Sequence, residues 1–335
     1  MRVAVIGAGV VGLATTAELL TRGADVTCFE RGGPMRERSK GESRIFRYAH
    51  RVPELVEAAR HALQLFGAWE KAAGQTLVEP VGTVVTGDDV HEWAAAMTEA
   101  GAEHFVVEPG SAQLRVPGKA TTTSLVDPAG GVIRVDRIRA LLTGLTAGAL
   151  RTAHVHDLEP VGDGVVVHTG AGGEHFDTVV LAAGAATGPL AAQAGIFTPL
   201  ALHHHARFTF PLREGAPNPP QAWITTSGTL TYQHSSTPGH WAVGLELGPD
   251  QVGWLQGKDA SVDTLREATV AYVAQELEHV EPRVVDEVYC TPYDDLPDGI
   301  HHVRRDHVLV VYGENLMKFA PLIGDRTATM ALEGR

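Results

Sequence analysis

The chain has 335 residues, 44% of them hydrophobic and 20% charged, with a formal net charge of -13. This length predicts two domains with a sizeable core, and the acidic balance argues against a nucleic acid or an anionic membrane surface as a partner. The sequence has 2 cysteines and no apolar run that reads as a membrane span. It therefore predicts neither a disulfide framework nor a membrane protein, and the cytoplasm is the expected compartment.

The N-terminal segment carries the most specific motif. Residues 3–6 form an apolar run that predicts a buried strand, and Gly7, Gly9 and Gly12 follow at once. In this pattern the first glycine permits a tight turn, the second lets a pyrophosphate approach the backbone, and the third lets the next helix pack on the strand. A second strand ends on Glu30, whose carboxylate can accept both ribose hydroxyls. Because a glutamate there disfavours a 2′-phosphate, the motif predicts a site for NAD or FAD rather than NADP.

Two interpretations without a dinucleotide compete with this one. Arg2 followed by an apolar run is compatible with the start of a signal peptide, and the glycines alone are compatible with a tight turn that binds nothing. The first leaves the glycine spacing unexplained, and the second leaves Glu30 unexplained. The dinucleotide site is therefore favoured.

The next segments alternate between loop and helix. Residues 31–41 are too polar to pack as an element. Arg44 and Arg47 follow, three positions apart among apolar residues, which predicts one side of a helical turn; the alternative is a solvated basic turn. Residues 53–74 predict an amphipathic helix that a glycine ends.

The remaining elements alternate between helix and strand. The expected elements are a strand at 81–86, a helix at 91–100, an extended segment at 104–107, a surface excursion at 109–128, a helix at 136–145, a hairpin at 154–168, a buried strand at 176–181, two or three antiparallel strands at 223–247, a helix at 261–277, a strand at 308–312 and a helix from 324. A strand and helix that return after a long insertion indicate an interrupted nucleotide-binding domain.

Three adjacent histidines, His203 to His205, suggest a metal site. Adjacent residues of a strand point to opposite faces, and no cysteine or acidic residue stands at a suitable spacing. We expect no metal.

Taken together, these segments resemble the monomeric sarcosine oxidase branch of the D-amino-acid-oxidase-like FAD enzymes. The resemblance covers most of the chain and rests on the glycine motif, residues 42–47, the strand end at 183–185, Cys290, and residues 318–321. It implies an α/β fold class (α+β overall), with an interrupted Rossmann-like FAD-binding domain and a β-rich substrate domain. The expected FAD-binding domain comprises residues 1–77, 130–198 and 295–335, and the expected substrate domain 78–129 and 199–294.

The resemblance also implies a reaction. A monomer or small homo-oligomer would oxidise the C–N bond of an amino acid or small secondary amine to an imine, passing electrons to O2 and forming H2O2. The resemblance places Arg44 beside the flavin ring, Arg47 and Lys318 on the substrate carboxylate, and a flavin thioether on Cys290. The first three are the expected catalytic residues. The expected FAD contacts are Gly7, Gly9, Val10, Val11, Gly12, Glu30, Arg31, Ser43, Arg44, Val155, Ala183, Gly184, Cys290, Gly313, Asn315, Leu316, Met317 and Lys318.

Two departures from the family pattern leave the electron acceptor and the substrate class open. Residues 240–243 contain no lysine, whereas the family's oxidases carry one there that promotes the reaction of reduced flavin with oxygen. The usual Gly-His-Gly before the C-terminal Lys-Phe is replaced by residues 314–317. Two alternatives are a flavin hydroxylase, suggested by the Gly-Asp pair in residues 322–325, and a flavin-binding subunit without turnover.

Overall fold

The computed structural model describes residues 1–198, 201–293, 296 and 299–333, and the chain forms two compact units. The first comprises Met1–Lys40, Arg137–Leu202 and Tyr293–Arg335, and the second Gly41–Asp136 and His203–Pro292. Residues 41–77 and 130–136, which the sequence assigns to the FAD-binding domain, thus lie in the second unit, where their strands pair with one another. Four expected boundary residues, 199, 294, 295 and 335, lie outside the described residues. The assignment of FAD to one domain and of substrate to the other stays a prediction.

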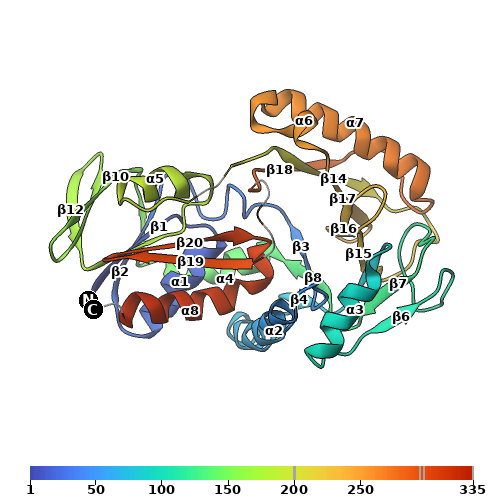
Figure 1. The fold of residues 1–335 in the computed structure, drawn as a ribbon, viewed down its shortest axis with the longest axis horizontal. Coiled ribbons are helices and arrows are strands. Elements are labelled where there is room, and N and C mark those ends of the chain that lie inside the picture. Colours follow the sequence, from blue (N-terminus) through green and yellow to red (C-terminus); the bar gives the residue numbers. More distant parts are fainter. Residues whose placement is uncertain (199–200, 294–295, 297–298, 334–335) are drawn as a thin grey trace. The chain divides into compact units, whose positions relative to one another are not determined.

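The first unit is built on a six-stranded sheet in the order β19-β20-β13-β1-β2-β9. Its strands are β1 (Arg2–Ile6), β2 (Asp25–Glu30), β9 (Leu150–Thr152), β13 (Thr178–Leu181), β19 (Gly299–Arg305) and β20 (Val308–Glu314). All pairs are parallel except β19 with β20. The C-terminal strand therefore returns to the sheet of the N-terminal strand (Figure 1), as the sequence predicts, and the α/β fold class is confirmed.

The sheet's helices include the first and last of the chain. They are α1 (Val10–Thr21), α4 (Val135–Thr146), α5 (Thr187–Gln193) and α8 (Ala320–Glu333), with short turns η1 (Gly184–Ala186) and η3 (Leu316–Phe319). A Cβ built on Gly324 of α8 would lie 2.8 Å from the carbonyl oxygen of Ala14, so α8 packs closely on α1. Helix α8 begins at Ala320, four residues before the expected start, because Pro321 is tolerated in a first turn where its missing N–H costs nothing.

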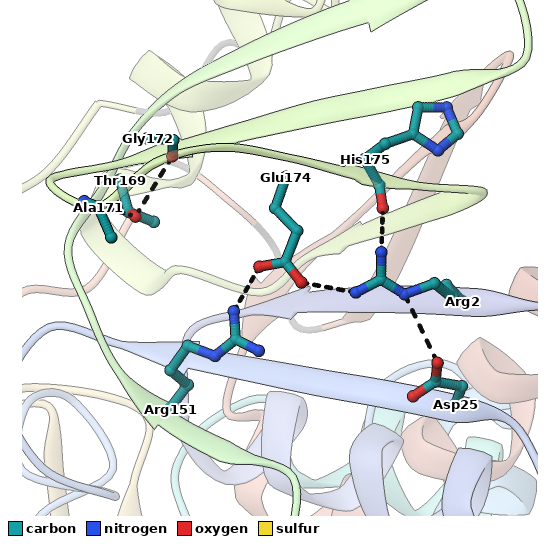
Figure 2. Close-up of polar contacts among 8 residues, drawn as sticks. All are labelled: Arg2, Asp25, Arg151, Thr169, Ala171, Gly172, Glu174 and His175. Carbon is teal, nitrogen blue, oxygen red and sulfur yellow. Dashed lines mark hydrogen bonds and ion pairs between the residues drawn. The ribbon is translucent and has the colours of Figure 1, made fainter.

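A small antiparallel sheet completes this unit: β10 (Val155–Val161), β11 (Gly164–Thr169) and β12 (Gly172–Phe176). This confirms the expected hairpin. Figure 2 shows Glu174 of β12 between Arg2 and Arg151, which come from β1 and β9, with Arg2 Nη2 2.5 Å from Glu174 Oε1. The expected strand at 176–181 is instead two strands, because β12, which ends at Phe176, pairs with β11 in the small sheet, whereas β13, which begins at Thr178, pairs with β1.

The second unit contains an eight-stranded sheet in the order β18-β14-β17-β16-β15-β5-β7-β6 and a three-stranded sheet in the order β3-β8-β4. The strands are β3 (Ser43–Phe46), β4 (Val78–Glu79), β5 (Thr83–Thr86), β6 (Phe105–Val107), β7 (Ser124–Asp127), β8 (Gly131–Arg134), β14 (His205–Pro211), β15 (Ala222–Thr225), β16 (Thr231–Ser235), β17 (His240–Leu245) and β18 (Asp286–Cys290). The three strands of residues 222–245 confirm the expected antiparallel group. Residues 109–128 were expected at the surface, but they end in β7, whose four residues are buried and which pairs with both β5 and β6.

The helices of the second unit are α2 (Pro53–Ala73), α3 (Val90–Glu99), α6 (Pro249–Val252) and α7 (Lys258–Glu276), with the turn η2 (Trp254–Gln256). One core joins Phe208, Phe210 and Trp241 of the large sheet to Leu265 and Val273 of α7. Within the described residues, no helix is both long and apolar enough to cross a membrane.

Candidate functional site

The glycine turn of the first unit lies at the carboxyl ends of the parallel strands, between β1 and α1. Gly7 has φ +102°, and a Cβ built on it would lie 2.6 Å from the carbonyl oxygen of Ala182. A Cβ on Gly12 would lie 1.8 Å from the carbonyl oxygen of Gly7. Only glycine satisfies both positions, because the turn needs the left-handed backbone at one and close helix-to-strand approach at the other.

Glu30 ends β2 and holds this turn. Its Oε2 accepts the N–H of Ala8, and its Oε1 accepts the N–H of Gly32, each at 2.9 Å. An ionised carboxylate has about four lone-pair sites, so Glu30 can hold the backbone and still accept ribose hydroxyls.

The first turn of α1 begins with Val10 and Val11. Ser39 Oγ accepts the N–H of Val10 at 3.1 Å, so a hydroxyl from the polar loop already engages an N–H at this helix start. The sequence analysis assigned no element to that loop and missed Ser39, because nothing in the loop's own sequence marks which hydroxyl reaches the helix start.

The segment after β13 lies against the turn. The N–H of Ala182 donates to the carbonyl of Ile6 at 3.0 Å, which brings Ala183 and Gly184 beside the glycines. The Gly184 carbonyl accepts the hydroxyl of Tyr293 at 2.9 Å.

Two further expected contacts differ in exposure. Val155 is 5% exposed and belongs to the apolar core, but the nearby Ala153 donates its N–H to the carbonyl of Glu30 at 2.9 Å, so the start of β10 lies near the end of β2. Arg31 is exposed, with its guanidinium 3.7 Å from Glu37.

The C-terminal segment of the first unit is tightly constrained. A Cβ on Gly313 would lie 2.1 Å from the carbonyl oxygen of Gly299, and Asn315 has φ +53° just before η3, which contains Leu316 and Met317. Lys318 is 3% exposed, with Nζ 5.2 Å from the centre of the Phe319 ring.

Glu314 occupies part of the run that departs from the family pattern. It forms an ion pair with Arg38 and accepts the N–H of Tyr293 at 2.6 Å. The guanidinium of Arg38 also lies 5.1 Å from the centre of the Tyr293 ring. Glu314 therefore connects the end of β20 to two other segments of the same unit, a role that its local sequence does not reveal.

In the second unit, the segment of Ser43, Arg44 and Arg47 is extended. The expectation of a helical turn was wrong, because residues 43–46 form β3 and pair with β8, and sheet pairing outweighs local spacing. Arg47 follows β3 and is 5% exposed. Its Nη1 donates to the carbonyl of Ala49 at 2.7 Å, and its guanidinium lies 5.2 Å from the centre of the Trp93 ring.

Asp127, which sequence reasoning missed, fixes the backbone after Arg47. Its Oδ2 accepts the N–H groups of Tyr48 and Ala49 at 2.5 and 3.1 Å, and its Oδ1 accepts two more from the following turn at 3.1 Å each. Burial raises the pKa of Asp127 to about 6, although these four donors favour the charged form. The sequence feature that could have indicated Asp127 is an aspartate before a proline at the end of an apolar run.

Arg207, on β14, was also missed. It is 9% exposed, and its Nη1 donates to the carbonyl of Ser43 at 3.0 Å. A Cβ built on Gly41 would lie 3.0 Å from Nη2 of Arg207 and 3.0 Å from Nη1 of Arg44, so both guanidinium groups approach one backbone position. Burial and the charge of Arg44 lower the pKa of Arg207 to about 9. The sequence feature that could have indicated Arg207 is a positively charged residue between apolar residues in a strand-like run.

Cys290, on β18, lies directly opposite His205 on β14, with Sγ 3.4 Å from His205 Nδ1. Arg207 is two residues along β14 and faces Gly244 of β17. Side chains on a strand alternate, so Arg207 and Ala242 share one face of the sheet. The strand where the family pattern has a lysine thus lacks one, but its neighbour carries a buried arginine on the same face.

The histidine run forms no metal cluster: across the described ranges, no three His, Cys, Asp or Glu side chains are grouped to hold an ion. His204 Nδ1 lies 2.8 Å from the Tyr289 hydroxyl, and its ring stacks on Trp254 at 4.9 Å.

Residues 2–330 match the family described as FAD dependent oxidoreductase. The chain belongs to this family. The monomeric sarcosine oxidase of Streptomyces avermitilis is 24% identical over 366 residues, which cover 99% of this chain and 94% of that protein. Among solved structures, the open form of NikD, described as an unusual amino acid oxidase essential for nikkomycin biosynthesis, has a TM-score of 0.86 at 23% identity and covers 99% of this chain and 94% of its own. Glycine oxidase from Geobacillus kaustophilus has a TM-score of 0.79 at 19% identity, covering 100% and 95%.

FAD is the cofactor of this family, and the first unit fits it. The backbone of the glycine turn leaves no room for side chains at Gly7 and Gly12, and α1 presents its N-terminal N–H groups there. Glu30 is the residue whose carboxylate we expect at the ribose. The contacts of the individual residues with FAD stay predictions.

The Gly-Asp pair that suggested a hydroxylase has a packing role in this fold. Gly324 allows α8 to approach α1 at Ala14, and the Asp325 carboxylate lies 2.6 Å from Arg22 Nη2. These contacts account for both residues without a ligand.

Proposed function

We propose that this FAD dependent oxidoreductase oxidises the C–N bond of an amino acid or small secondary amine to an imine and passes the electrons to O2, forming H2O2. The family match over residues 2–330 and the similarity to a sarcosine oxidase and a glycine oxidase support the amine substrate. The structural observation that carries the proposal is the buried guanidinium of Arg47, which a carbonyl and an aromatic ring hold in place. Bound FAD would supply the two-electron acceptor for this oxidation.

We assign substrate carboxylate binding to Arg47 and Lys318. The planar guanidinium of Arg47 can bind both carboxylate oxygens, and the Ala49 carbonyl and Trp93 ring fix its orientation. The Lys318 ammonium provides a second positive charge. Holding the carboxylate positions the adjacent C–N bond for reaction.

We assign Arg44 and Cys290 to the cofactor. Arg44 supplies a positive charge that favours extra electrons on it. Cys290 is the residue that would hold it through a sulfur–carbon bond. We also place the protein in the cytoplasm, because both of its cysteines, Cys28 and Cys290, are free thiols.

The test is an anaerobic screen of amino acids and secondary amines for loss of flavin absorbance, followed by readmission of air. Bleaching by an amine and recovery in air with H2O2 release are expected. Oxygen uptake that NADH stimulates without any amine, in a protein that no amine bleaches, would instead indicate a hydroxylase.

Recovery in air also tests the acceptor. We expect slower reoxidation than in relatives with a lysine on the strand matching β17, because Ala242 offers no cation to stabilise superoxide as it forms. Rapid reoxidation that is lost in Arg207→Met would assign that function to Arg207.

A further inference from the structure

Residues 31–40, which follow β2, run along the carboxyl edge of the six-stranded sheet. The N–H of Met35 donates to the carbonyl of Ala8 at 2.9 Å, and Met35 is 1% exposed. Ser39 Oγ accepts the N–H of Val10 at 3.1 Å. These contacts hold the loop against the glycine turn after β1 and against the start of α1, the two parts of the first unit that fit a dinucleotide.

Arg38 joins this loop to the end of β20. Its guanidinium forms an ion pair with Glu314 and lies 5.1 Å from the centre of the Tyr293 ring. Tyr293 donates its N–H to Glu314 at 2.6 Å, and its hydroxyl donates to the carbonyl of Gly184, after β13, at 2.9 Å. We define the cofactor strap as residues 31–40 together with Glu314 and Tyr293.

The strap spans the place where ligands bind to sheets of this kind. Strands β2, β1, β13 and β20 are adjacent and parallel, so their carboxyl ends lie in a row. Neighbouring strands are about 4.8 Å apart, so the row from β2 to β20 is roughly 14 Å long. Dinucleotides bind outside these ends, beside the glycine turn. The ion pair of Arg38 with Glu314 therefore connects the two sides of the turn, from the loop after β2 to the end of β20.

We propose that Arg38 and Glu314 are positioning residues for the cofactor, and that their ion pair closes residues 31–40 over the FAD site and must open before FAD enters or leaves. This role rests on FAD as the cofactor of the family and goes beyond the proposed function, because it does not depend on the amine substrate. It also accounts for Glu314, one of the residues that replace the Gly-His-Gly of the family pattern.

The burial of this ion pair makes its opening slow. The side chains of Arg38 and Glu314 are 26% and 11% exposed, so each charge loses its partner before water can fully replace it. The same loop contains an exposed pair, Arg31 with Glu37, whose side chains are 56% and 79% exposed. An exposed pair of this kind contributes little. The two glutamates therefore offer a matched comparison of the same substitution.

The experiment measures FAD exchange in the full-length Cys290→Ser protein, so that no covalent bond can hold the flavin. Exchange of bound FAD against an excess of radiolabelled FAD gives the dissociation rate constant. Fluorescence quenching after FAD is mixed with flavin-free protein gives the association rate constant. Trypsin cleavage within residues 31–40, quantified by mass spectrometry with FAD bound, reports opening of the loop without any turnover.

Arg38→Met and Glu314→Gln should each raise both rate constants by roughly tenfold, a value between those expected for an exposed and for a fully buried pair. Because a closed strap slows entry and exit alike, the Kd should change less than either rate constant. Both variants should also be cleaved faster within the loop. Arg38→Lys, which keeps the charge, should exchange FAD more slowly than Arg38→Met, and Glu37→Gln should change nothing.

Unchanged exchange in folded Arg38→Met and Glu314→Gln would overturn the strap. So would a weaker Kd in Arg38→Met with normal exchange in Glu314→Gln, since Arg38 would then bind the cofactor by itself. If Glu314→Gln fails to fold, the comparison of Arg38→Met with Arg38→Lys decides. Normal exchange in the strap variants of a protein that oxidises amines refutes only this inference, whereas fast exchange in the variants of a protein that no amine bleaches refutes only the proposed function.

Discussion

Replacing Gly12 with alanine should damage the glycine turn. The new Cβ would lie 1.8 Å from the carbonyl oxygen of Gly7, 3.0 Å from its carbonyl carbon and 3.4 Å from Val5 Cγ1. A carbon and an oxygen normally stay more than about 3 Å apart, so α1 must move away from β1 by roughly 1 Å. Overpacking costs about 1–3 kcal/mol when side chains adjust; here the clashing atoms are main chain, so we expect about 3 kcal/mol or more.

Gly67→Ala is the matched control for the same chemical change. Gly67 lies inside α2, and a Cβ there meets no atom within 4 Å. Alanine should therefore stabilise the protein by about 0.5–1 kcal/mol through its higher helix propensity. Urea denaturation followed by far-UV circular dichroism measures both changes, and flavin content per protein measures cofactor retention. A Gly12→Ala protein with wild-type stability and full flavin content would refute the argument.

Three other changes test the site and the second unit. Arg47→Met and Lys318→Met should each raise the KM for the true substrate. Each change should weaken the binding free energy by roughly 2–5 kcal/mol if it leaves a buried charge unpaired. Unchanged kinetics in both variants would refute the carboxylate assignment. Cys290→Ser should release flavin into the supernatant after acid treatment, whereas the wild-type polypeptide band should stay fluorescent; free flavin from wild type would refute the attachment. Because the pKa of Asp127 is raised from 3.8 to about 6 in the folded state, that state binds the proton more tightly, and the free energy of unfolding should fall by about 3 kcal/mol in total as pH rises from about 3 to about 7. Asp127→Asn should lack this slope in denaturation at several pH values, and an equal slope would contradict the assignment.

The strand, glycine turn, helix and strand at the start of the first unit were predictable because their signals are local. A short stretch of sequence contains the apolar run before Gly7, the glycine spacing and Glu30. These features predict the buried strand, the tight turn and the end of the second strand without reference to distant residues. The extended form of residues 43–46 was not predictable in this way. Its cause is β8, which lies far away in the sequence and supplies the hydrogen bonds.

The candidate site shows the same division. The residues of the glycine turn follow one another in the chain and could be named in order. The position of Arg207 is explained only by Ser43 and Arg44, which lie in a distant segment of the sequence. The role of Asp127 is explained only by its hydrogen bonds from Tyr48 and Ala49. Non-local partners of this kind leave at most a polar residue within an apolar run as a trace in the sequence.

The return of β20 to the sheet of β1 has a consequence for synthesis in the cell. As the chain leaves the ribosome, β1, β2 and β13 emerge long before β20 and α8, so one edge of the nascent sheet and the apolar side of α1 stay uncovered while the second unit is being made. An open parallel edge is a site for wrong pairing with other chains, and contacts between distant segments form slowly. Completion of the glycine turn's supporting sheet is thus a late, post-translational event, and yield in a heterologous host should depend on chaperones that protect this edge until the last helix arrives.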